Sequence, residues 1–471
     1  MNRVHLRWAP LARLLSAGSI AFALAACSSS DTPTSQLRAI HASADAPNVD
    51  LQVNGAVQAT NVAYKSASTF FTFQQGTNRI QINPTGATTS VIDLSPSLIG
   101  NHRYTALVVG SAAANAPTGQ QLTTVLVDDP ANPPAVGNVK VRVVHGAPAV
   151  SAVDIYLTAP GAALPAEPTI PGLAFTNAAP ASGANALEVP AGDYEIRATL
   201  AGTQTVAFDS GPIALPENGD LLITAIPSSG VSPVSLLVAP VGVSAYVVSD
   251  SRAAIRVAHF SPNTPAVDVF LKAPASANSA DNRVQQNLAF PSASSYLTVA
   301  SGSYDASVAL AGTLTGVLNL NGATLAANTS TSVFAIGLLG GTGAQALQLA
   351  AYADDRVPAA GQAKVRVIHL APDAPAVDVV VLSAGAVAAT PVSNLNYPSA
   401  TPAYLQLTPG TYTLAVVPNG TTSPILPSPS GVTVTLQAGQ IATIAATGCL
   451  NTATGPCAGG QPFALTVLSD N

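Results

Sequence analysis

The chain is poor in charged residues, in aromatic residues and in cysteine. Only 8% of its 471 residues are charged and 5% are aromatic, whereas 48% are hydrophobic. Trp8 is the single tryptophan and lies near the amino terminus, which weakens a sugar-binding interpretation without excluding one based on tyrosine. The 36 glycines and 38 prolines favour short strands and turns over helices. The composition therefore predicts an all-β protein with substantial apolar cores.

Basic residues are especially scarce. Three of the 17, Arg3, Arg7 and Arg13, lie in the first 26 residues, so the remainder carries 14 basic against 23 acidic residues, a net charge of −9. Nucleic acids and anionic lipid surfaces are bound through basic patches. The charge balance therefore argues against nucleic acid as a partner, and no cofactor is predicted.

The first 26 residues have the pattern of a signal peptide. The three arginines precede an apolar run, residues 14–26, that is shorter than the ~20 residues of a spanning helix. The run ends Leu24-Ala25-Ala26-Cys27, which resembles a bacterial lipobox. The resemblance implies cleavage before Cys27, acylation of Cys27, and a lipid anchor in the cell envelope. Ser28 favours the outer membrane by the same resemblance, although an ordinary signal peptide with a chance cysteine is the alternative. Residues 27–36 would then form a lipidated tether.

Two further cysteines lie near the carboxyl terminus. Cys449 and Cys457 flank a short loop that contains Gly, Pro and Asn. In an oxidising compartment this spacing favours a disulfide. A metal site is the alternative, but no histidine or further cysteine lies nearby in the sequence, and we predict none.

One motif, Arg-x-x-His followed after eight residues by Asp, occurs four times at intervals of roughly 110 residues. An internal repeat of this kind indicates one domain in tandem copies. The four copies, which share identical spacing, are Arg38-His41-Asp50, Arg142-His145-Asp154, Arg256-His259-Asp268 and Arg366-His369-Asp378.

The residues around each motif alternate between apolar and polar, which is typical of half-buried strands. A glycine pair ten residues apart follows in every copy, and three copies contain Gly-x-Tyr, with Tyr194, Tyr304 and Tyr412. Such a tyrosine resembles those that fix a corner in sandwich folds. We therefore predict four tandem immunoglobulin-like antiparallel β-sandwiches of about seven strands each; a small barrel is the alternative. The predicted repeats are residues 37–129, 139–250, 253–355 and 363–471.

The motif resembles the opening R-x-x-H-x-[SA]-P-x-x-P-x-V-D of the domain-of-unknown-function 4397 family. Copies three and four match nearly throughout, whereas Ala44 and Ser151 each replace one proline in the first two copies. The resemblance implies an exported, often lipid-anchored β domain, found in tandem. The family carries no established activity, so it supplies no catalytic residues.

The motif histidine and aspartate invite a functional interpretation, as a metal or catalytic site. One His and one carboxylate per domain are too few ligands for a firm zinc site, and no nucleophile has a fixed offset from them. We favour a structural role, in which His binds the backbone of the proline turn and Arg and Asp pair on the outer face. Asp128-Asp129 and Asp354-Asp355 fall at domain ends and are interpreted as solvated linker charge, with an interdomain calcium site as the alternative.

Three classes of function remain. The favoured one is a structural or adhesive surface scaffold, because stalks and multivalent binders gain from copies. The second is a periplasmic or surface binding module for a polysaccharide or small ligand, through loops of variable length. The third, a metal-assisted hydrolase, is disfavoured because enzymes seldom need four equivalent sites. We therefore expect no enzyme activity, and partners that are a membrane, through the lipid anchor, and a surface protein or glycan.

Overall fold

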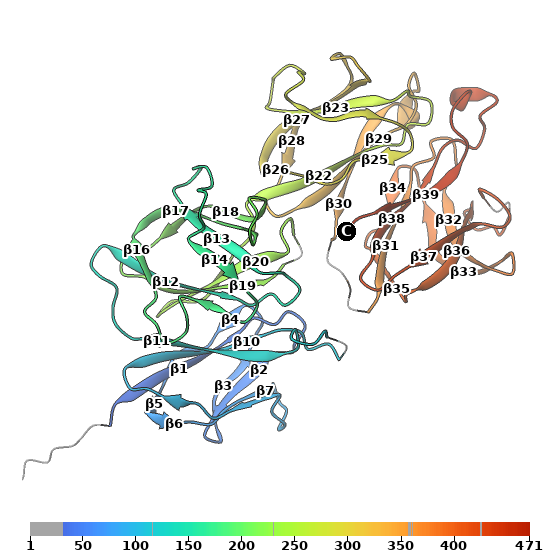
Figure 1. The fold of residues 1–471 in the computed structure, drawn as a ribbon. Coiled ribbons are helices and arrows are strands. Elements are labelled where there is room, and N and C mark those ends of the chain that lie inside the picture. The colour runs from blue at the N-terminus through green and yellow to red at the C-terminus, as the bar shows by residue number, and fades with distance from the viewer. Residues whose placement is uncertain (1–31, 115, 229, 357–358, 360, 424–425) are drawn as a thin grey trace, which may run out of the picture.

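The computed structural model describes residues 32–471 except 115, 229, 357, 358, 360, 424 and 425. The described residues form strands and two short 3-10 turns, Gly343–Gln345 and Gly455–Cys457, and none of their helices is long and apolar enough to cross a membrane. Four β-sandwiches follow one another along the chain, each built from two main sheets (Figure 1). Repeat 1 has an additional two-stranded sheet, in which Gly76–Thr77 pairs with Ser97–Leu98. The predicted all-β fold class is therefore confirmed.

The strands recur in the same order in each repeat. Repeat 1 contains β1 (Thr34–His41), β2 (Val49–Val53), β3 (Ala56–Val62), β4 (Ser66–Ala67), β5 (Phe71–Gln74), β6 (Gly76–Thr77), β7 (Ile80–Pro84), β8 (Ile92–Leu94), β9 (Ser97–Leu98), β10 (His102–Val109) and β11 (Thr123–Pro130). Repeat 2 contains β12 (Asn138–His145), β13 (Val153–Thr158), β14 (Ile170–Leu173), β15 (Ala178–Ala179), β16 (Leu187–Pro190), β17 (Gly192–Leu200), β18 (Val206–Leu215), β19 (Asp220–Pro227), β20 (Val234–Pro240) and β21 (Tyr246–Val248).

The second half of the chain repeats this plan. Repeat 3 contains β22 (Arg252–His259), β23 (Val267–Lys272), β24 (Arg283–Leu288), β25 (Ser292–Ala293), β26 (Leu297–Ala300), β27 (Gly302–Leu310), β28 (Gly316–Leu325), β29 (Ser330–Ile336) and β30 (Gln348–Asp354). Repeat 4 contains β31 (Ala363–His369), β32 (Val377–Ser383), β33 (Ala386–Leu395), β34 (Ser399–Ala400), β35 (Leu405–Leu407), β36 (Gly410–Pro418), β37 (Val432–Leu436), β38 (Ile441–Thr447) and β39 (Ala464–Ser469).

The motif strand lies in the middle of one sheet, which we call sheet I. In repeat 4 the order of sheet I is β39-β38-β31, with β34 and β35 both pairing with the far edge of β31. The second sheet, sheet II, has the order β33-β32-β36-β37. Sheet pairing is antiparallel except that β31 runs parallel to β38, and the same parallel pair occurs in the other three repeats. This pair places the motif arginine beside a residue 67 to 80 positions later in the chain.

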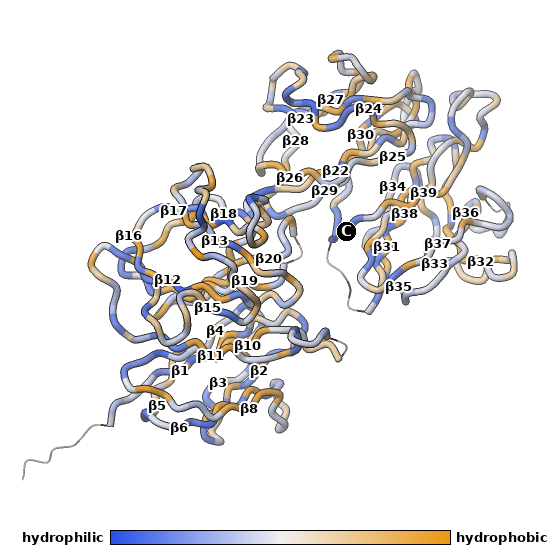
Figure 2. The backbone as a smooth tube through the Cα atoms, viewed as in Figure 1, coloured by the Kyte–Doolittle hydropathy of each residue, from blue (hydrophilic) through white to orange (hydrophobic). Residues whose placement is uncertain are grey.

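Each sandwich encloses an apolar core between its two sheets, which Figure 2 shows as hydrophobic strand segments facing one another. In repeat 4, Val365 and Val367 of the motif strand pack into this core. The histidine, two positions further on, is completely buried. The alternation along the strand therefore positions the core as the sequence predicted.

The other face of sheet I is buried too, against the next repeat. Ile40 and Leu107 of repeat 1 cluster with Val144 and Leu222 of repeat 2. Phe260 and Phe334 of repeat 3 cluster likewise with residues of repeat 4. The motif strands are therefore not half-buried, as predicted, but buried on both faces. The prediction was wrong because a single-domain pattern does not reveal that sheet I packs on a second sheet I.

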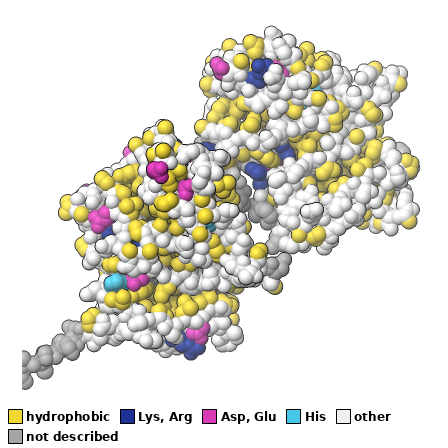
Figure 3. Space-filling model, in the orientation of Figure 1, with side chains coloured by type: hydrophobic (Ala, Val, Ile, Leu, Met, Phe, Trp, Pro, Cys, Tyr) yellow, Lys and Arg dark blue, Asp and Glu magenta, His cyan; other side chains and the backbone are white. Residues whose placement is uncertain are grey.

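The four repeats thus form two pairs, repeats 1 and 2 and repeats 3 and 4, each joined face to face through sheet I (Figure 1). Such sheet-on-sheet packing buries apolar area as a sandwich core does. The face shown in Figure 3 carries scattered charges among uncharged and apolar side chains. The basic unit of the structure is therefore a pair of sandwiches rather than a single one.

The corner tyrosines fix the start of the strand that follows the first glycine of the repeated glycine pair. The hydroxyls of Tyr194, Tyr304 and Tyr412 each donate to the backbone carbonyl four residues earlier, at 2.7 to 2.9 Å. Asn78, which replaces the tyrosine in repeat 1, donates to the equivalent carbonyl of Gln74. The asparagine therefore preserves the contact that its position requires.

The loop after the second strand varies in length among the repeats. It is a tight turn in repeats 1 and 4 but spans residues 159–169 in repeat 2 and 273–282 in repeat 3. Both insertions bind a strand of their own sheet II. The backbone N–H of Gly161 donates to Glu195 in β17, and that of Ala275 donates to Asp305 in β27. These contacts hold each insertion on its own repeat.

Candidate functional site

Each motif histidine is completely buried at the end of its strand. In repeat 4, His369 Nε2 lies 3.0 Å from the carbonyl oxygen of Pro375, and Nδ1 accepts the N–H of Ala371 at 3.4 Å. The ring is therefore a neutral tautomer that carries its proton on Nε2. His41, His145 and His259 contact the equivalent backbone groups. Both ring nitrogens are thus used within the proline turn, as a structural role requires.

An aromatic ring, which the motif does not reveal, packs edge-on against each of these histidines. The partners are Tyr64, Phe175, Phe290 and Tyr397, with ring centroids 6.0 to 6.4 Å apart. Burial lowers the pKa of all four imidazoles below the ordinary value, despite the carbonyl contacts that oppose the shift. Each ring is therefore held neutral where an exposed histidine begins to gain a proton.

This lowering predicts that the protein loses stability on mild acidification. A histidine whose pKa is lower in the folded state binds protons first in the unfolded state, so its contribution is complete above pH ~6.5 and falls below it. The expected loss approaches about 1.4 kcal/mol per histidine per pH unit between the two pKa values. Urea unfolding at pH 7.5, 6.5 and 5.5 measures it. A stability that is flat or rises over this range would contradict the buried neutral rings.

Each motif aspartate binds two turns of sheet II. In repeat 4 the carboxylate of Asp378 accepts the N–H groups of Asn394 at 2.8 Å and Gly420 at 2.9 Å. Asn394 has φ of +53° and Gly420 has φ of +74°, both in the left-handed region. Asp50, Asp154 and Asp268 accept the equivalent pairs of N–H groups. The second glycine of the repeated pair is thus the turn residue whose N–H binds the motif aspartate.

Motif Arg and motif Asp were predicted to pair with each other on the outer face, and this prediction is wrong. The arginines lie in sheet I and the aspartates in sheet II, so the two residues are on different sheets of the sandwich. Each arginine instead reaches across the interface to the other repeat of its pair. Sequence spacing could not reveal this, because the acceptors lie 201 and 214 residues later for Arg38 and Arg256, and in the preceding repeat for Arg142 and Arg366.

The arginines of repeats 3 and 4 form a reciprocal pair of ion pairs. Arg256 Nη2 lies 2.7 Å from Asp470 Oδ1, and Arg366 Nη2 lies 2.6 Å from Asp354 Oδ1. Tyr296 and Tyr404 donate their hydroxyls to Asp354 and Asp470, both at 2.9 Å. Ser332 and Thr443 donate to the same two carboxylates. All four charged side chains are at most 3% exposed, so this network is a buried clamp between the two sandwiches.

The first pair of repeats has half of this arrangement. Arg142 of repeat 2 donates through Nε to Asp129 of repeat 1 at 2.7 Å. Asp129 and Asp354 are therefore not solvated linker charge, as predicted, but interdomain ion-pair partners. Among the residues that the structure describes, Arg38 of repeat 1 contacts no carboxylate and donates instead to the carbonyls of Ala239 and Pro240.

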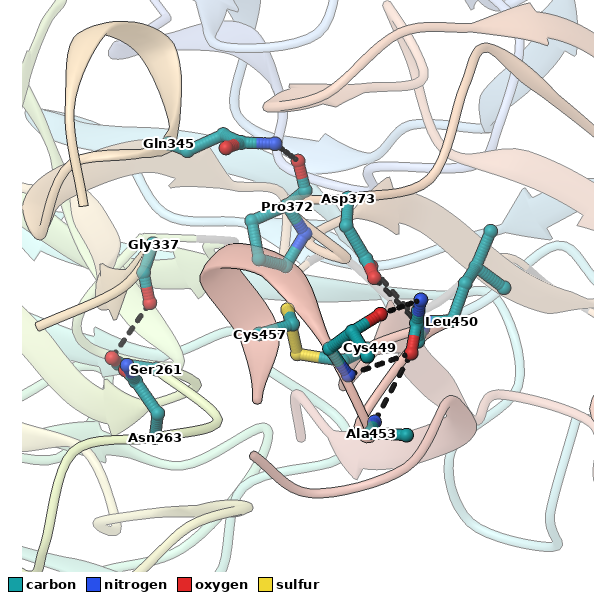
Figure 4. Close-up of a disulfide and its surroundings, with 12 residues drawn as sticks. Ser261, Asn263, Gly337, Gln345, Pro372, Asp373, Cys449, Leu450, Ala453 and Cys457 are labelled. Carbon is teal, nitrogen blue, oxygen red and sulfur yellow. Dashed lines mark hydrogen bonds between the residues drawn. A yellow bond between two sulfur atoms is a disulfide. The ribbon is translucent and has the colours of Figure 1, made fainter. Parts of the chain in front are cut away.

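The predicted disulfide between Cys449 and Cys457 is present and lies beside the contact between repeats 3 and 4 (Figure 4). Both sulfurs are buried with Leu338 of repeat 3. Gln461 donates its N–H to the carbonyl of Pro262 at 3.0 Å, and Gln345 reaches the carbonyl of Pro372 at 2.9 Å. The disulfide loop thus belongs to the surface that joins the two repeats.

Asp373 lies within 4.8 Å of the two sulfurs, close enough for a metal site with reduced cysteines. Its two carboxylate oxygens accept the N–H groups of Leu450 and Asn451, both at 2.9 Å. Asp45 of repeat 1 binds Ala112 N–H in the same way at 2.9 Å. Asp373 therefore has the loop-binding role that its counterpart has without any cysteine. Cys27, the predicted lipidation residue, lies outside the described residues.

The fold and motif define a protein built from repeated β-sandwich modules. The chain belongs to the family described as domain of unknown function (DUF4397), whose model matches residues 35–156 and 253–380, more than half of the chain. Each match begins at the first strand of a pair and ends in the second strand of its partner repeat. The family model thus matches two segments of the chain, one in each pair of repeats.

Comparisons with other proteins add little. No curated protein sequence matches the chain. Among solved structures, a product complex of the multi-modular glycogen-degrading pneumococcal virulence factor SpuA is 10% identical, with a TM-score of 0.15; the match covers 62% of this chain and 38% of that one. The Bacillus anthracis TIE protein is 8% identical, with a TM-score of 0.16, over 88% and 68% of the respective chains. At these TM-scores the likenesses support no conclusion about function.

Proposed function

We propose that this protein is a lipid-anchored scaffold of the bacterial cell envelope, with four copies of the family's domain that act as two rigid double modules. One observation carries the proposal: the polar residues repeated in every copy are occupied by contacts within the fold or between paired repeats. His binds the proline turn, Asp binds two turns of sheet II, and Arg contacts the paired repeat. The repeated residues thus serve to fold each sandwich and to join it to its paired repeat.

Sheet-to-sheet pairing supports a spacer or presenting role. Each pair buries two sheet faces against each other, which fixes the relative position of its two sandwiches. A rigid double module keeps whatever it carries at a set distance from the membrane. The proposal includes a surface protein or glycan as partner, an outer-membrane location, and no catalytic activity.

A binding module for a polysaccharide or small ligand is the second candidate. The variable loops were its expected site, but the backbone N–H groups of Gly161 and Ala275 in these loops donate to carboxylates of their own sheet II. The observation that favours this candidate lies elsewhere, at Arg38, which has no ion-pair partner within the described residues.

The lipid anchor is tested by Cys27→Ala in the full chain. We expect the variant to leave the membrane fraction, because alanine cannot be acylated and the acyl chains are what would hold the protein on the membrane. Fractionation followed by detergent extraction measures the change, with Ser28→Ala as the matched control that keeps the cysteine. A Cys27→Ala protein that still requires detergent for extraction would rule out this anchor.

A further inference from the structure

Three of the four motif arginines bind a carboxylate of the paired repeat, whereas the fourth, Arg38, binds backbone carbonyls there. In each repeat, the residue that lies beside the motif arginine pairs in turn with a residue of the last long strand. The carboxylate that binds the arginine of the paired repeat lies two positions after that last-strand residue. This position holds Asp129 in repeat 1, Asp354 in repeat 3 and Asp470 in repeat 4. In repeat 2 the pairing of Leu222 with Ala239 places Val241 there. Repeat 2 therefore has a valine, and not a carboxylate, at the position that would bind Arg38 of repeat 1.

Arg38 keeps every other contact of a clamp arginine. Its Nε donates to Thr105, as Arg256 and Arg366 donate to Ser332 and Thr443. Its Nη1 donates to the Pro240 carbonyl at 3.2 Å, the counterpart of the Ser469 carbonyl that Arg256 binds. The guanidinium lies 4.7 Å from the centre of the Phe70 ring, which stands where Tyr296 stands in repeat 3.

The charge of Arg38 is buried, and no carboxylate of the described part of the chain forms an ion pair with it. The residue is 4% exposed, and its three hydrogen bonds to described residues all go to uncharged oxygens. A guanidinium has five N–H groups, so these contacts leave one N–H on each terminal nitrogen without an acceptor among the described residues. Burial, and next the positive charge of Arg103, lower the pKa of Arg38 to about 10, against the weaker pull of Asp220 and Asp129.

A pocket opens at this arginine. It has a volume of about 410 Å³ and lies between repeats 1 and 2, where the segment after β20 faces β1. Its lining includes Arg38, Gln36, Ser68, Phe70, Val241 and Ser244. This volume falls within the ~300–1,000 Å³ typical of small-molecule sites, and the mixture of an aromatic face with a few polar groups is also typical.

We propose that this pocket binds a small molecule through its carboxylate group, which takes the place that an aspartate of the protein occupies in the other clamps. A carboxylate presents two oxygens to the two terminal nitrogens of a guanidinium, and such charge-assisted contacts are stronger than neutral ones. The remainder of the ligand lies over Phe70 and against the hydroxyl of Ser244, because the hydroxyl of Ser68 already donates to the carbonyl of Thr69. A hydroxylated carboxylic acid, such as a uronic acid, has this combination of groups.

The site is tested by isothermal titration calorimetry on the chain from residue 28 onward, with sodium glucuronate as the probe. Glucose, which has a closely related ring without the carboxylate, and inorganic phosphate are the comparison probes. Val241→Asp restores the missing aspartate and is expected to weaken glucuronate binding at least tenfold while raising the melting temperature. Val136→Asp adds the same charge at a side chain that is 94% exposed, and should leave binding unchanged.

We expect saturable glucuronate binding at one site and none of glucose. A wild-type chain that does not bind glucuronate, or a folded Val241→Asp variant that binds it as well as wild type, would overturn the proposal. Tighter binding of phosphate than of glucuronate, lost in Val241→Asp, would overturn the assignment to carboxylates. If Val241→Asp fails to fold, Ser244→Asp places a negative charge at an exposed pocket residue and must weaken binding.

Discussion

Asp470→Ala is expected to destabilise the pair of repeats 3 and 4 by about 3–5 kcal/mol, because it leaves the buried Arg256 without its counter-ion. The same carboxylate accepts the hydroxyls of Tyr404 and Thr443, so two further donors lose their acceptor. Urea unfolding measures the loss of stability. Small-angle X-ray scattering of the native variant is expected to show a larger radius of gyration, since the clamp joins two sandwiches.

Two further variants separate the ion pair from general damage. Asp281→Ala removes a carboxylate from an exposed position of the same pair and should change stability by less than about 0.5 kcal/mol. Arg256→Met combined with Asp470→Leu replaces both charges by apolar groups, which is often neutral for a buried pair. We expect this double variant to recover most of the lost stability. A double variant no better than Asp470→Ala alone would contradict the assignment of the loss to an unpaired charge.

His369→Ala is expected to cost repeat 4 about 3 kcal/mol, from a cavity in a completely buried site together with two unpaired backbone groups. The two groups are the carbonyl of Pro375 and the N–H of Ala371. Differential scanning calorimetry of the chain from residue 28 onward measures the change, which should appear in the transition of the pair that contains repeat 4.

His102→Ala is the matched control. The His102 side chain is 21% exposed and pairs with Asp128 near the surface, so its loss is expected to cost less than about 1 kcal/mol. A His369→Ala protein as stable as wild type, with altered binding of a metal or ligand instead, would contradict the structural role of the motif histidine.

Much of the fold follows from the sequence. The exact spacing of four motifs defined the repeats, and alternation such as Val365, Val367 and His369 identified the face of the strand that meets the core. The proline turn and the loop between Cys449 and Cys457 are local features, so their contacts could be predicted from short spacings. What could be predicted is thus what neighbouring residues determine.

The interdomain contacts could not be predicted in this way. Ile368 and Leu222 have the apolar character of a core residue, but a single repeat offers nothing to say that a second sandwich covers them. Arg366 and Asp354 are close in sequence, yet they come from different repeats and meet only because the two sheets face each other. One signal was available: an aspartate recurs at the end of the last strand in repeats 1, 3 and 4, as Asp129, Asp354 and Asp470.

Both ring nitrogens of each motif histidine bind backbone groups of the fold, which leaves neither free for a metal or a ligand. The most direct test of this structural role is the protonation state of the four rings. Long-range proton–nitrogen NMR spectra of the chain from residue 28 onward, labelled with nitrogen-15 on histidine, report the tautomer of each ring. We predict that His41, His145, His259 and His369 are neutral with the proton on Nε2 at pH 6.5, and that their shifts do not change when zinc or glucuronate is added. Rings that are protonated at this pH, or nitrogen shifts that move when zinc is added, would contradict the account.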